Sequence, residues 1–147
     1  MPTQVLPTQV LQQPQDPQVS VAARWLGRML SSLAILFLLF DGAIKLDPLG
    51  VVTETMDRIG YGSSETLARS LGAITVVCTL LYAVPPTSFV GAILLTGYLG
   101  GAIVSHVRIG SPLFTDVLFG LSLGLMVWGG LWPRDASLRQ LLPFQRS

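Results

Sequence analysis

A long stretch without charge limits what this chain can fold into. Thirty-six consecutive residues, 70–105, contain no Asp, Glu, Lys, Arg or His. As one helix the stretch would be about 54 Å long, whereas the hydrocarbon core of a bilayer is about 30 Å thick. Pro85 and Pro86 stand near its middle, where proline cannot continue a helix. The stretch therefore predicts two antiparallel membrane spans, roughly 67–84 and 88–107.

Two further apolar segments predict one more span on each side of this pair. The first, residues 25–44, has an uncharged core of only 12 residues, 29–40, so a span there must carry Asp41 at one end. The nine Leu, Ile and Phe side chains of residues 29–44 contribute about −0.5 kcal/mol each, which outweighs at most about 3.5 kcal/mol for the aspartate. The last segment, residues 117–133, is uncharged. We therefore expect an all-α fold, a four-helix transmembrane bundle.

The connection between the first two spans, residues 46–66, is rich in charge and lies outside the membrane in this prediction. Within it five side chains recur at offsets of three and four, the period of one helix face, and Gly60 follows them: Val51, Val52, Thr55, Met56 and Ile59. This pattern predicts a short amphipathic helix that lies at the membrane interface.

The ends of the chain differ from its centre. The first 20 residues are rich in Pro and Gln and repeat PTQVL in tandem, which is typical of disorder. The predicted organisation is a disordered tail at 1–22, a four-span membrane domain at 23–133 and a surface C-terminal tail at 134–147.

Composition excludes several classes of function. The net charge of +1 gives no basic footprint for nucleic acid, so the expected surroundings are the lipid bilayer. Cys78 is the single cysteine and cannot form an internal disulfide. The sequence has no nucleophile elbow, paired carboxylates, phosphate-binding glycine loop or metal-ligand spacing. It therefore predicts no catalytic residue and no metal site, and it identifies no cofactor.

Charge also bears on orientation. Four crossings would put both termini and the Pro85-Pro86 turn on one side, together with five Lys and Arg residues, against four on the other side. The positive-inside rule then favours cytoplasmic termini, in a multi-pass protein of the bacterial inner (plasma) membrane.

Most polar side chains of the spans gather on the side opposite the termini. Asp41 and Lys45 are four residues apart on one helix face and can neutralise each other. His106 ends the third span and Asp116 begins the fourth, so we expect His106 to turn toward Asp41 or Asp116. Two interpretations remain open, namely span ends that reach toward water and a polar vestibule that binds a ligand.

Glycines predict where helices approach closely. Gly97 and Gly101 form a GxxxG spacing, as do Gly120 and Gly124, and such pairs seat a second helix within the bundle or in a homodimer. At about 100° per residue, Gly97 and Gly101 lie about 140–180° from His106. The glycine face and the histidine face should therefore meet different neighbours.

Several short patterns follow one another along the chain: 42–48 (GAIKLDP), 59–61 (IGY), 91–102 (GAILLTGYLGGA) with His106 and Arg108 after it, 128–131 (WGGL), Arg134-Asp135 and 141–143 (LLP). Together they resemble the DoxX-like family of small bacterial four-helix membrane proteins, over roughly residues 29–144. By this resemblance Lys45, Tyr98, His106 and Arg108 occupy motif positions. It also implies a link to membrane redox systems, because the wider group includes a quinone-linked thiosulfate-oxidising complex.

Three functions are consistent with these features. The first is an accessory or redox-associated membrane subunit that packs with a partner or binds a small lipophilic molecule such as a quinone. The second is a small-solute or proton pathway that uses Asp41, His106 and Asp116. The third, a quinone-reacting enzyme, needs a flavin, haem or metal, and the sequence marks no site for one.

Overall fold

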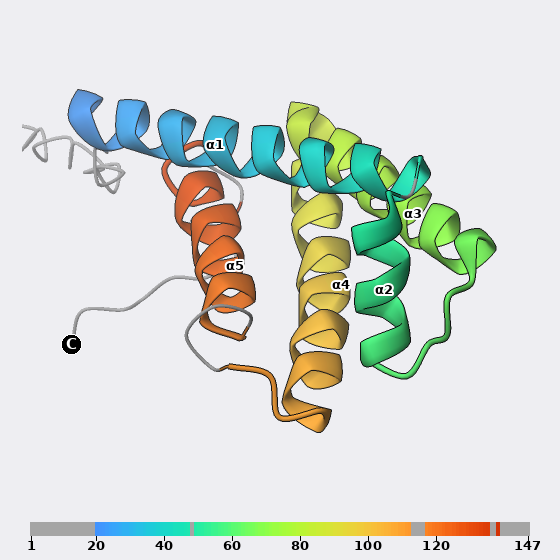
Figure 1. Ribbon diagram of the computed structural model, residues 1–147. Helices are drawn as coiled ribbons and strands as arrows, with labels where there is room; N and C mark the ends of the chain where they lie inside the picture. The colour runs from blue at the N-terminus through green and yellow to red at the C-terminus, as the bar shows by residue number, and fades with distance from the viewer. Residues whose placement is uncertain (1–19, 48, 113–116, 136–137, 139–147) are drawn as a thin grey trace, which may run out of the picture.

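The computed structural model describes residues 20–47, 49–112, 117–135 and 138, and all regular elements within these ranges are helical (Figure 1). The all-α prediction is therefore confirmed for the described part of the chain. Its elements are α1 (Val21–Leu46), α2 (Gly50–Arg58), α3 (Glu65–Ala83), the 3-10 helix η1 (Pro85–Thr87), α4 (Ser88–Arg108) and α5 (Leu118–Leu131). Asp116 and most of the two predicted tails lie outside the described residues.

The helix ends follow from local side-chain chemistry. The Ser20 and Ser64 hydroxyls accept hydrogen bonds from the first turns of α1 and α3, which satisfies backbone N–H groups there. α3 ends where Pro85 removes the next N–H donor, as the sequence predicted. In the turn that follows, the Thr87 hydroxyl donates to the Leu81 carbonyl oxygen at 2.7 Å. This hydrogen bond ties the bend between the two central spans to the last turn of α3.

Three helical segments are long and apolar enough to cross a membrane: α1, α3, and η1 with α4. Only 22%, 33% and 28% of their most apolar windows are buried inside the protein. Most of their apolar side chains therefore face outward, which is stable in lipid and not in water. The chain is a multi-pass membrane protein. At 14 residues α5 is about 21 Å long, so the fourth span stays a prediction.

Each of the four longest helices packs against two others, because α1 and α4 both contact α3 and α5. In Figure 1 the axis of α1 runs across the axes of α4 and α5, so a regular four-helix bundle is not confirmed. The core between them is apolar, and its fully buried members include Leu38, Leu95, Val127 and Leu131.

One buried polar network ties this core together. The hydroxyls of Ser31 and Tyr82 are 2.9 Å apart, and the Tyr82 hydroxyl also donates to the Val127 carbonyl oxygen at 2.8 Å. Both side chains are almost completely buried. The network joins α1, α3 and α5, and its groups satisfy one another, as buried polar groups must.

The residues predicted to form an interfacial helix do form a helix, α2, but its position at a membrane interface is not confirmed. α2 lies beside the C-terminal half of α4 (Figure 1). The segment after α2 holds it there, because the Tyr61 hydroxyl is 2.8 Å from that of Ser105. Arg108 also donates to the Ile59 carbonyl oxygen at 3.5 Å. Met56 on the apolar face of α2 is thus buried against the protein, whereas Val51 on the same face is 72% exposed.

The close approaches of α1 to its neighbours use glycines outside the two GxxxG pairs. A Cβ atom added at Gly72 of α3 would lie 2.8 Å from the Gly42 carbonyl oxygen and 2.8 Å from the Lys45 Cβ atom of α1. One added at Gly130 of α5 would lie 3.0 Å from the Gly27 carbonyl oxygen of α1. Two glycine pairs therefore set the contacts of α1 with α3 and α5.

The predicted GxxxG positions have different surroundings. At Gly120 an added Cβ atom would lie 2.9 Å from Ile103 of α4. At Gly97, Gly101 and Gly124 no described atom would lie within 4 Å of it. No described helix of the same chain is therefore seated on these three glycines, and a contact with a second copy stays a prediction. The reason at Gly97 and Gly101 is that a cavity separates them from α2.

Replacement of Gly72 by leucine should destabilise the protein, because the side chain would have to displace α1 backbone. The expected loss is about 1–3 kcal/mol in the free energy of unfolding, the usual cost of overpacking. Thermal unfolding of the purified protein in mild detergent measures it. Gly124→Leu is the matched control, since its Cβ position is open, and equal effects of the two variants would contradict the assignment.

Candidate ligand-binding site

A cavity of about 510 Å³ lies between α2, the C-terminal half of α4 and the end of α1. Its volume falls within the range of small-molecule sites, about 300–1,000 Å³. Most of its wall is apolar, and this part includes Val51, Val52, Met56, Ile59, Leu71 and Ala102. Polar side chains converge on it from three helices and one loop: Asp41, Lys45, Thr55, Tyr61, Tyr98, Ser105 and His106.

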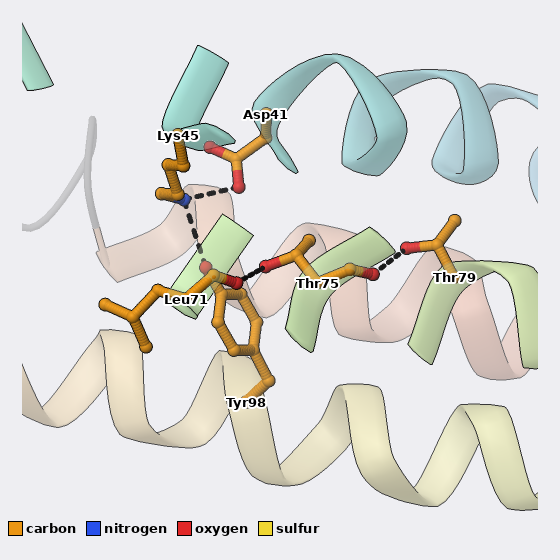
Figure 2. A network of polar contacts seen from close by, with 6 residues as sticks. All are labelled: Asp41, Lys45, Leu71, Thr75, Thr79 and Tyr98. Atoms are coloured by element: carbon orange, nitrogen blue, oxygen red, sulfur yellow. Dashed lines mark hydrogen bonds and ion pairs between the residues drawn. The ribbon is translucent and has the colours of Figure 1, made fainter. Parts of the chain in front are cut away.

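Lys45 is the centre of the polar wall. Its ammonium group donates to the Asp41 carboxylate at 2.5 Å and to the Tyr98 hydroxyl at 3.0 Å (Figure 2). The ammonium nitrogen also lies 5.6 Å from the centroid of the Tyr98 ring. The Lys45 and Asp41 side chains are only 23% and 32% exposed. The predicted pair exists, and it reaches across to α4 through Tyr98.

The glycine contact between α1 and α3 accounts for the position of Lys45. Because Gly72 has no side chain, the Lys45 Cβ atom can lie against the α3 backbone. Farther along α3, the hydroxyls of Thr75 and Thr79 donate to carbonyl oxygens one turn earlier, at 2.8 Å and 2.7 Å (Figure 2). The hydroxyls of Thr75 and Thr79 are therefore used within α3, and neither side chain lines the cavity.

His106 lies in the same wall, eight residues after Tyr98 on α4. Its Nδ1 atom is 3.2 Å from the Ser111 hydroxyl. A smaller cavity of about 140 Å³ on the side of α5 is also lined by His106, Asp41, Lys45 and Tyr98. The structure therefore places His106 and Asp41 at the same two cavities, whereas Asp116 lies outside the described residues.

The expectation that the glycine and histidine faces meet different neighbours stays a prediction, and both faces border one cavity. Gly97, Gly101 and His106 all line the larger cavity. The cavity spans two adjacent ridges of α4, one that runs through Gly97, Gly101 and Ser105 and one that runs through Tyr98 and His106. A wide cavity can contact side chains that a single packed helix could not reach together.

Of the four motif residues, Lys45, Tyr98 and His106 line the cavity, whereas Arg108 lies outside its wall. Its guanidinium group contacts the Ile59 carbonyl oxygen, so it helps to hold the loop after α2. Conversely, Tyr61 and Ser105 line the cavity and were not predicted as site residues. The three- and four-residue spacing of α2 predicts its apolar face, but the same spacing fits a helix on a membrane surface and a helix on a cavity.

The charges at the cavity nearly cancel. Asp41 and Lys45 form an ion pair, and the remaining ionisable side chains of its wall are His106 and two tyrosines. In the described ranges no three His, Cys, Asp or Glu side chains come together as a metal ion would require. The polar groups of the wall can donate and accept hydrogen bonds.

Removal of Lys45 should destabilise the protein mainly because it leaves the Asp41 carboxylate without its cation. For Lys45→Met we expect a loss of about 1–3 kcal/mol, below the cost at a fully buried pair because both side chains are partly exposed. The double variant Asp41→Asn/Lys45→Met should recover more than half of this loss in detergent unfolding measurements. A double variant as unstable as the sum of the two single variants would contradict this explanation.

Comparison with known proteins agrees with the resemblance of the motifs. The sequence profile of the DoxX-like family matches residues 29–130, which include Asp41, Lys45, Tyr98, His106 and Arg108. No curated protein and no solved structure matches the chain. Because the profile covers well over half of the sequence, the chain belongs to the DoxX-like family.

Proposed function

We propose that this protein binds a small lipophilic molecule of the quinone class in the larger cavity, as an accessory or redox-associated subunit of the membrane. The observation that carries the proposal is an apolar cavity of about 510 Å³ with Lys45 and Tyr98 in its wall. An apolar site with a few convergent polar groups is the usual form of a small-molecule pocket.

The polar groups suit a carbonyl oxygen. Lys45 has three N–H donors, of which Asp41 and Tyr98 accept two, so one is left for a ligand. The Tyr98 hydroxyl accepts from Lys45 and can donate its own proton. Two donors side by side at the end of an apolar cavity would orient a quinone head group with its tail along α2 and α4.

The proposal includes an arrangement in the membrane. With α5 as a fourth crossing, both termini lie on the cytoplasmic side of the inner membrane and the cavity lies near the opposite surface. Gly124 of α5 has an open Cβ position and does not line the cavity, which leaves room there for a redox partner or a second copy.

A second candidate function is a small-solute or proton pathway. It is favoured by one observation, namely that Asp41, Lys45, Tyr98 and His106 line both cavities. A solute or proton could pass between the cavities along this shared wall. Flux into proteoliposomes tests it, and flux that is unchanged by Asp41→Asn and His106→Ala would remove this candidate.

Filling the cavity should abolish ligand binding without unfolding the protein. Gly101 lines the cavity and its Cβ position is open, so the side chain of Gly101→Leu would occupy ligand space. We expect at least about a tenfold loss of affinity for a short-chain benzoquinone, since bound ligand and leucine exclude each other. Equilibrium binding to protein in lipid nanodiscs, corrected for empty nanodiscs, measures this.

The matched control is Gly100→Leu on the same helix. Gly100 also has an open Cβ position but does not line the cavity, so quinone affinity should stay at the wild-type value. Equal affinities of both variants and the wild type would show that quinone binds elsewhere. A wild-type protein without saturable binding would contradict the proposed function itself.

A further inference from the structure

We propose that Asp41 selects the charge of the ligand, so that the cavity takes an uncharged head group with a carbonyl oxygen and rejects an anionic one. This inference rests on the proposed binding site and names the class of molecule that fits it. It excludes fatty acid anions and acidic lipid head groups, although the site contains a lysine.

The first step is the state of the lysine. The Lys45 ammonium group is 2.5 Å from the Asp41 carboxylate, with both side chains mostly shielded from water. At this distance the positive charge is already balanced by a full negative charge. A ligand therefore meets a hydrogen-bond donor that belongs to a neutral pair, and not a free cation.

The second step is the cost of an anion. A carboxylate that accepts the remaining Lys45 donor would stand beside the Asp41 carboxylate, which lines the same cavity. Two like charges at a poorly hydrated site repel each other strongly, and the anion also loses its own hydration. A neutral carbonyl or amide oxygen accepts the same hydrogen bond without either cost.

The third step concerns the other charged groups nearby. Glu54 and Arg58 of α2 pair with each other at 3.0 Å, and neither lines the cavity. Arg108 contacts the loop after α2 and is outside the wall. Apart from Lys45, only His106 among the described lining residues can carry a positive charge. The open donor belongs to Lys45, and Asp41 neutralises the charge of Lys45.

The test compares two ligands of nearly equal shape, decanamide and decanoate, at about pH 9, where the carboxyl group is ionised. Site-specific binding is the nanodisc signal of the wild type less that of Gly101→Leu. We expect the wild type to bind decanamide at least about tenfold more tightly than decanoate. Equal binding, or tighter binding of decanoate, would overturn the inference while leaving the binding site in place.

The variant Asp41→Asn keeps the shape of the wall and removes the negative charge. It should remove most of the preference for decanamide, so that decanoate binds at least about tenfold more tightly than in the wild type. Glu54→Gln is the matched control, because it also removes one carboxylate from a pair four residues apart, and it should keep the wild-type preference.

Two further outcomes are decisive. An unchanged preference in a folded Asp41→Asn protein would overturn the role of Asp41. If that variant does not fold, the wild-type comparison of the two ligands still decides the inference. Absence of site-specific binding of both ligands and of benzoquinone would contradict the proposed function together with the inference.

Discussion

The close contact between α1 and α3 at Gly42 and Gly72 is the constraint on which the site depends. An added Cβ atom at Gly72 would collide with backbone and with Lys45, so the contact tolerates only hydrogen there. This contact brings the last turn of α1 against α3 and turns Lys45 toward Tyr98 of α4. Packing through glycine is how helices approach closely in lipid, where burial of apolar side chains gives little driving force.

The larger cavity exists because another pair of glycines is not used for packing. Gly97 and Gly101 have the GxxxG spacing of a helix contact, yet α2 does not pack against them. The contact between Tyr61 and Ser105 holds the segment after α2 against α4. Small side chains on α4 and an apolar face on α2 then enclose space instead of a contact. The same residue type thus closes one helix interface and opens a cavity at another.

Some of this arrangement was predictable from the sequence. Charge-free length and the twin prolines predict the α3–α4 pair, and the spacing of Asp41 and Lys45 predicts their ion pair, because both follow from local geometry. The choice among 15 glycines does not follow, since GxxxG spacing identifies a face and not its neighbour. The place of α2 depends on long-range contacts such as Tyr61 with Ser105, which periodicity does not encode.

The exposure of Gly97 and Gly101 on α4 bears on how the proposed ligand would reach the cavity. Gly97 and Gly101 are exposed, and on the same face of α4 so are Leu94 and Val104, at 44% and 67%. This apolar strip is the kind of surface that acyl chains cover. If the proposed ligand enters along this strip, it comes from the lipid, where a lipophilic compound accumulates far above its aqueous concentration. Occupancy would then follow the mole fraction of the compound in lipid, and a modest intrinsic affinity would be enough to keep the cavity filled.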